Sequence, residues 1–97
     1  MNGAKVLEVI VIYKKKFDHM GVKKIDYPHN RFLPIRNFRS LALAHCNGMF
    51  EKMEEFARAE RMDKVFRWLG FVQGVLWVCR VYTLEELKNH NRPTKED

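Results

Sequence analysis

The sequence predicts a mainly α-helical domain, and three observations lead to that fold class. Apolar side chains recur at three- and four-residue steps from Ile35 to Tyr82, which is the spacing of one helix face. Thr83 and Glu86 then stand at the positions of a capping box, which marks the start of another helix. The chain has 97 residues, 46% of them hydrophobic, which is enough for one core. We therefore expect an antiparallel helical hairpin followed by a short third helix.

The N-terminal part has a different pattern. Residues 6–13 are rich in β-branched side chains, which favour a strand over a helix. Gly21 closes a candidate turn, after which residues 22–27 could return as a second strand. We expect a basic N-terminal segment and connector, residues 1–34, able to pair as a β-hairpin, and a helical domain over residues 35–97. Met20 offers an alternative start, which would make residues 1–19 a dispensable extension.

The predicted hairpin consists of one helix from about residue 35 to 58 and another over residues 63–82. A single unbroken helix over residues 35–81 would be about 70 Å long, far beyond the usual length of a globular helix. Asp63 is a suitable N-cap for the second helix. A turn near residue 62 would place Phe56 opposite Leu69 and Cys46 near Cys79.

The second predicted helix is apolar on nearly every side, since Gln73 is the one strongly polar residue between Arg67 and Arg80. Such a helix is normally buried on nearly every side. We expect it to be covered by the N-terminal segment, by the third helix or by another copy of the chain. Its charge-free run covers residues 68–79, shorter than the roughly 20 residues of a bilayer span, so no membrane crossing is predicted.

Two glycines stand one helical turn apart in this helix and allow another backbone to approach closely. The alternatives are contact across a dimer axis and intramolecular packing against the preceding helix. We predict a self-associating protein, a homo-oligomer, whose helix–helix contact uses Gly70, Gly74, Trp68, Phe71 and Trp77.

The net charge of +6 arises entirely within residues 1–40, which contain nine basic and three acidic residues. Such a basic segment can attract nucleic acid, an acidic protein or an anionic membrane, or it can simply be solvated. Cations interleaved with aromatic rings are typical of single-strand binding, so nucleic-acid binding is the alternative function. The candidate contacts are Lys14, Lys15, Lys16, Lys23, Lys24, Arg31, Arg36 and Arg39.

Catalysis has little support in the sequence. Ser40 is the one serine, no glycine-rich phosphate loop is present, and two cysteines are too few for a zinc motif or a disulfide framework. We therefore expect no enzyme activity, no cofactor and no metal. Cys46 and Cys79 are expected to be reduced in a cytoplasmic protein.

The segments 66–77, 82–87 and 90–93 resemble small proteins of tailed bacteriophages, a likeness that covers residues 38–93. The resemblance implies a viral accessory protein that binds a host protein in the host cytoplasm, and it implies no functional residues. Together these observations predict a non-enzymatic interaction protein.

Overall fold

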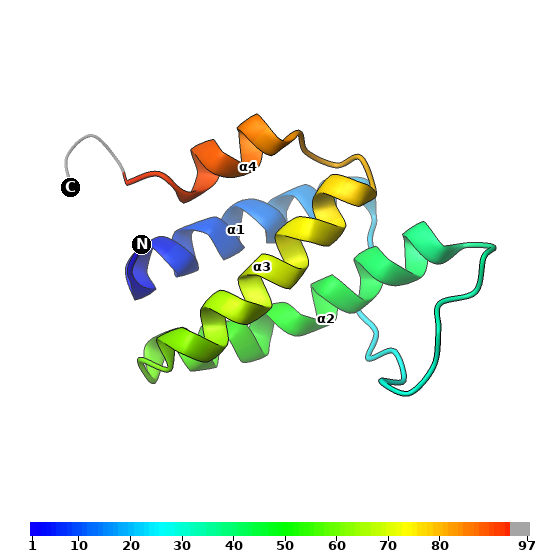
Figure 1. Ribbon diagram of the computed structural model, residues 1–97, viewed down its shortest axis with the longest axis horizontal. Coiled ribbons are helices and arrows are strands. Elements are labelled where there is room, and N and C mark those ends of the chain that lie inside the picture. Colours follow the sequence, from blue (N-terminus) through cyan, green and yellow to red (C-terminus); the bar gives the residue numbers. More distant parts are fainter. Residues whose placement is uncertain (94–97) are drawn as a thin grey trace.

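The computed structural model describes residues 1–93 and contains four helices, with no strand among those residues (Figure 1). The mainly helical prediction is confirmed. The helices are α1 (Gly3–Met20), α2 (Phe38–Arg58), α3 (Met62–Val78) and α4 (Leu84–Asn91). The C-terminal end of the domain expected at residues 35–97 lies outside the described residues.

The predicted N-terminal β-hairpin is wrong, because its first strand lies within helix α1. The side chain of Asn2 caps this helix by accepting a hydrogen bond from the backbone N–H of Lys5 at 2.9 Å. The fully buried side chains recur at helical spacing, and burying this stripe outweighs the weak strand preference of β-branched residues. They are Val6, Val9, Ile10, Tyr13 and Phe17.

The predicted turn at Gly21 is the end of α1. Gly21 has φ 73°, in the left-handed region that glycine adopts without strain. The next backbone N–H, of Val22, donates to the carbonyl of Phe17 at 2.9 Å and closes the last turn. The chain therefore leaves the helix as a connector and does not return as a strand.

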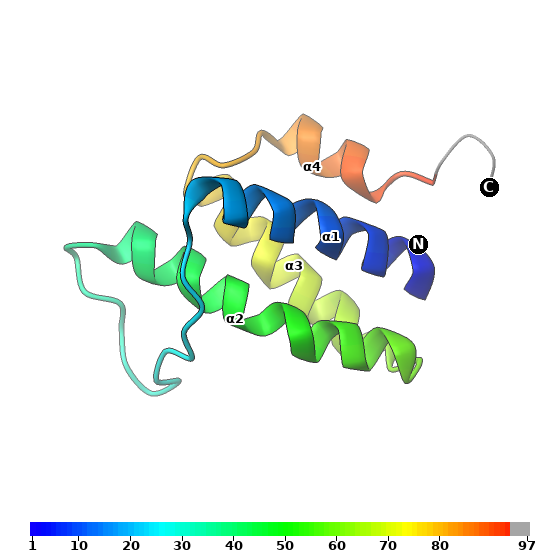
Figure 2. The same ribbon diagram turned by 180° about the vertical axis from the view of Figure 1, so that it is seen from behind.

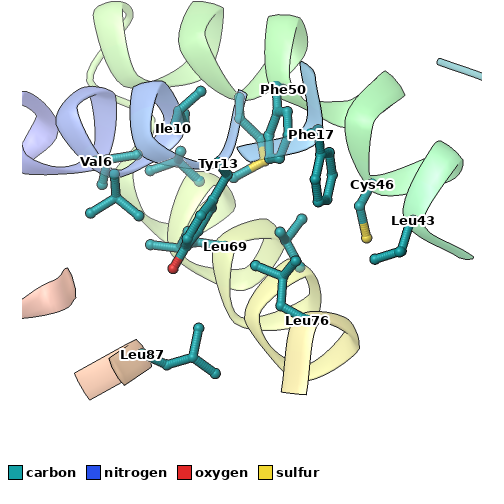
Figure 3. Close-up of a cluster of buried hydrophobic side chains, with 14 of the residues drawn as sticks. Val6, Ile10, Tyr13, Phe17, Leu43, Cys46, Phe50, Leu69, Leu76 and Leu87 are labelled. Carbon is teal, nitrogen blue, oxygen red and sulfur yellow. The ribbon is translucent and has the colours of Figure 1, made fainter. Parts of the chain in front are cut away.

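One core joins α1 to the other helices. Side chains from α1, α2 and α3 converge on it, and Leu87 of α4 reaches its edge (Figure 3). Seen from both sides, α1 lies between α4 and α2, and α3 crosses α1 (Figure 2). The boundary expected at residue 34 therefore falls in the loop between two helices that share this core.

Helices α2 and α3 are joined by a short turn and run in opposite directions (Figure 1). Glu60, in the turn, has φ 58°. The ring of Phe56 packs edge-on against Trp68, with centroids 5.1 Å apart, one residue from its predicted neighbour Leu69. Helix α3 begins at Met62, so the predicted cap at Asp63 is wrong.

Hydrogen bonds hold the first part of the α1–α2 connector along α2. Buried Asn47 donates through Nδ2 to the carbonyl of Val22 at 3.1 Å, and the N–H of Ile25 donates to the carbonyl of Ala44 at 3.2 Å. A Cβ on Gly48 would collide with the carbonyl oxygen of Ile25, so this close approach requires glycine.

Helix α4 begins with the predicted capping box. The N–H of Glu86 donates to Thr83 Oγ1 at 3.1 Å, and the N–H of Thr83 donates to Glu86 Oε1 at 2.9 Å, which confirms the prediction. These hydrogen bonds hold the pKa of Glu86 below its ordinary value.

A polar network joins α4 to α1 and α3. The Tyr13 hydroxyl lies 3.0 Å from His90 Nδ1 and accepts a hydrogen bond from Gln73 Nε2 at 2.9 Å. Gln73 and Asn91 exchange two further hydrogen bonds through their amides. Burial raises the pKa of Tyr13 to about 12, so the hydroxyl stays protonated at neutral pH.

Candidate functional site

The two sides of α3 have opposite surroundings. Val65, Leu69, Val72 and Leu76 are buried against the core, whereas the opposite side faces outward and no described element covers it. Within residues 1–93, neither the N-terminal segment nor α4 covers this side as expected, and cover by another copy of the chain stays a prediction. The physical reason is that α1 and α2 lie on the inner side, and α4 packs over α1 (Figure 1).

The two glycines predicted as a contact lie on this outward side. A Cβ built on Gly70 or on Gly74 would meet no atom within 4 Å. Intramolecular packing against the preceding helix therefore does not explain them. Each glycine in a helix interior costs about 1 kcal/mol relative to alanine. No contact within residues 1–93 offsets that cost.

Large apolar side chains surround the glycines. Phe71 is 53% exposed and Trp77 50% exposed, and both were predicted as contact residues. Phe66 and Val78 are also exposed, at 39% and 63%, and lie outside the predicted contact set. Their helical spacing from Gly70 and Gly74 could have identified them. We call this set the α3 outer face: Phe66, Gly70, Phe71, Gly74, Trp77 and Val78.

Trp68, the remaining predicted contact residue, does not belong to the α3 outer face. Its ring is only partly exposed and packs against Phe56 of α2. Lys64 extends over the same two rings, 4.6 Å from the Phe56 centroid and 6.0 Å from the Trp68 centroid. Trp68 therefore stabilises the contact between α2 and α3.

A shallow groove of about 380 Å³ continues the α3 outer face towards α2. Phe71 belongs to both the groove and the α3 outer face. The ring of His45 stands edge-on to the Phe71 ring, with centroids 6.2 Å apart. His45 Nδ1 accepts a hydrogen bond from the N–H of Tyr27 at 3.1 Å, which fixes the imidazole at the groove wall. The groove is lined by His29, His45, Met49, Arg67, Trp68 and Phe71.

The predicted cationic residues are distributed over α1, the connector and the start of α2. Lys14 pairs with Glu54 at 2.6 Å, and Lys24 pairs with Glu51 at 3.2 Å. Arg39 donates through Nε to the carbonyl of Cys79 at 2.9 Å.

Lys16 lies over the ring of Tyr82, 5.7 Å from its centroid. Exposed Lys15 and Lys23, together with Arg31 and Arg36, have no ion pair recorded within residues 1–93. Among the predicted cations, Lys14 of α1 and Lys24 of the connector are therefore ion-paired, whereas both loop arginines belong to the group without an ion pair in residues 1–93.

Cys46 and Cys79 are free and buried. Burial raises the pKa of Cys46 to about 12, and the neighbouring Cys79 adds to that rise. Burial also raises the pKa of Cys79, against the lowering effect of Arg39. Within residues 1–93, no group of three or more potential metal-ligating side chains is assembled.

No described helix combines the length and the apolar character that a membrane crossing requires. No protein-family model matches the sequence, and searches of the curated proteins and of the solved structures found no significant match.

Proposed function

We propose that this protein is a non-enzymatic interaction protein that self-associates through the α3 outer face. The observation that supports this proposal most directly is the pair of uncovered glycines with half-exposed aromatic rings beside them. Glycines one turn apart permit close contact between helix backbones, and aromatic anchors supply much of the affinity of protein interfaces.

The charge distribution on α3 favours a second copy as the partner. No charged residue lies between Arg67 and Arg80, so the middle of an identical surface can approach without burying an acidic side chain, and Arg67 is the one charge at its end. A twofold axis at the level of Val72 would place Gly70 against Gly74 of the partner subunit. The two helices then run antiparallel, which places opposite ends of their dipoles together.

The same axis sets Arg67 at the level of Trp77 of the partner subunit. The long guanidinium side chain can then lie against the indole, which combines apolar burial with a cation–π contact. Twofold symmetry repeats the contact on the other protomer, as in a closed dimer.

Cysteine cross-linking tests this arrangement. Cys46 and Cys79 are buried, so an introduced surface cysteine is the thiol available for oxidation. In an antiparallel dimer, a mixture of Gly70→Cys and Gly74→Cys chains forms the mixed disulfide more readily than either variant forms its own. Equal linking of each variant alone would indicate a parallel pair, and absence of linking in all samples would contradict self-association through this face.

The resemblance to small phage proteins supports a host protein as a further partner of this interaction protein, in a host cytoplasm. A pull-down from a bacterial lysate with the immobilised protein, beside an immobilised unrelated basic protein of similar size, tests that part. A host protein that is captured by this chain alone and binds it again when purified supports it, and identical captured sets contradict it.

A further inference from the structure

The loop between α1 and α2 projects from one end of the helical body (Figure 1). Every residue from Pro28 to Ser40 is exposed. At its tip, Phe32 is 98% exposed and Ile35 94% exposed, the two most exposed large apolar side chains among the described residues. Large apolar groups displayed together in this way mark an interaction surface.

Hydrogen bonds hold the base of this loop. The N–H of Tyr27 is bonded to His45 of α2, and the Tyr27 hydroxyl donates to the carbonyl of Phe32 at 3.0 Å. A turn bond from the N–H of Arg31 to the carbonyl of Pro28 at 3.4 Å adds to this frame. The hydrogen bond holds the carbonyl of Phe32, while the ring of Phe32 stays in solvent.

The loop is also strongly biased in charge. No acidic residue occurs between Asp26 and Glu51, whereas three arginines do. Arg31 and Arg36 flank the apolar tip on either side and have no ion pair recorded within residues 1–93. An apolar tip between unpaired arginines is complementary to a surface with anionic groups above an apolar layer.

We propose that residues 28–37 form a docking loop for an anionic phospholipid surface, with Phe32 and Ile35 inserted below headgroups that Arg31 and Arg36 contact. Aromatic and aliphatic side chains partition into the boundary between headgroups and acyl chains, and each nearby cation strengthens attraction to anionic lipid. The loop lies outside the α3 outer face, and its His29 lines the groove that adjoins that face at Phe71.

Single-stranded nucleic acid fits this loop less well. Stacking of successive bases needs several aromatic platforms, but the tip offers one aromatic ring, Phe32, beside branched aliphatic Leu33 and Ile35. Aliphatic side chains gain little from bases and much from an apolar layer.

Vesicle flotation at low salt tests the proposal with the full chain. The probes are vesicles of phosphatidylcholine alone, vesicles of phosphatidylcholine mixed with phosphatidylglycerol, and a labelled single-stranded oligonucleotide. We expect binding to the mixed vesicles and little binding to either other probe. High salt should weaken the binding, since it screens exposed charges.

Two loop variants separate the apolar and ionic contributions. Phe32→Ser/Ile35→Ser should lower the vesicle partition coefficient by about tenfold or more. Arg31→Gln/Arg36→Gln should lower it about fivefold for each arginine. Matched controls outside the loop are Val11→Ser/Leu84→Ser and Lys15→Gln/Lys52→Gln, which change exposed side chains of similar type and should bind within about twofold of wild type.

Insertion of the loop into the vesicle surface is measured separately, by fluorescence. A polarity-sensitive dye on Asn30→Cys should shift its emission to the blue on mixed vesicles, and the same dye on Lys52→Cys should not. Absence of binding to mixed vesicles, equal losses in loop and control variants, an unshifted dye on Asn30→Cys, or stronger loop-dependent binding of the oligonucleotide would each overturn the proposal.

Discussion

The hydroxyl of Tyr13 lies 3.0 Å from Nδ1 of His90, although 77 residues separate the two along the chain. The ring of His90 also stands edge-on to Tyr13 and to Tyr82, at centroid distances of 5.4 and 4.7 Å. This pair joins the first helix to the last. It provides a sensitive probe of how α4 is held on the core.

Replacing Tyr13 by Phe should destabilise the fold by about 1–2 kcal/mol, because Gln73 and His90 both lose the hydroxyl as a partner inside a partly buried network. Urea unfolding followed by circular dichroism measures the change. Tyr27→Phe is the matched control, since its hydroxyl bonds an exposed loop carbonyl and its loss should cost less. Equal losses in the free energy of unfolding for the two variants would show that the network around Tyr13 does not stabilise the fold.

The stability of the fold should also depend on His90 at mildly acidic pH. Burial holds the pKa of His90 below its ordinary value of 6.5, and Lys5 lowers it further, although Glu86 acts in the opposite direction. Tyr13 and Tyr82 face the same ring. The folded state thus favours the neutral imidazole, and its contribution is present above about pH 6.5 and is lost as pH falls through the folded pKa.

Urea unfolding of wild-type and His90→Gln protein between pH 8 and 5, that is, across the ordinary His value of about 6.5, isolates this contribution. The other histidines and all carboxylates occur in both proteins, so the difference between the two curves reports on residue 90. We expect wild type to lose stability relative to the variant as the pH falls. A constant difference over the whole range would contradict the assignment.

Gly48 and Gly70 form a matched pair for substitution by alanine. Gly48→Ala should destabilise the protein because the new Cβ collides with the carbonyl oxygen of Ile25 and displaces the connector. Gly70→Ala should stabilise the isolated protomer by about 1 kcal/mol, since its Cβ meets open space and alanine is the better helix former. Thermal unfolding at low concentration measures both, and the same sign for both changes would refute the account.

The two cysteines should not react with thiol reagents in the folded protein. Both are buried, and the pKa of Cys46 is raised to about 12, so almost no thiolate is present at pH 8. We expect a thiol-reactive reagent to leave the folded protein unmodified and to label both cysteines in denaturant. Rapid labelling without denaturant would show that the end of the core near Cys46 opens readily.

Much of the helical architecture could be predicted because its signals are local. The apolar spacing between residues 38 and 78 and the capping box at Thr83 both act over a few residues. Helix α1 differs from the predicted strand because two signals in its sequence conflict. The β-branched composition favours a strand, whereas the spacing of Val6, Val9 and Tyr13 fits a helix. Burial of these side chains in the shared core makes the segment helical.

The candidate surface was predicted only in part. The sequence identifies Gly70, Gly74, Phe71 and Trp77 as a contact set, but it cannot show which side of α3 the rest of the chain covers. That side is set mainly by α2, with α1 beside it, through contacts between residues distant in sequence. The same reason explains why Trp68 belongs to the predicted contact set, although its ring packs against α2.

The central claim is that the α3 outer face joins two copies of the chain, and sedimentation equilibrium of wild type and Gly74→Leu tests it most directly. The added side chain projects into open space, so it should leave the fold intact while blocking close approach of the partner helix. Lys15→Leu places the same side chain at an exposed position of α1 as a control. We predict a concentration-dependent dimer for wild type and Lys15→Leu and a monomer for Gly74→Leu. A wild-type protein that stays monomeric at every concentration, or a Gly74→Leu dimer of unchanged affinity, would contradict the claim.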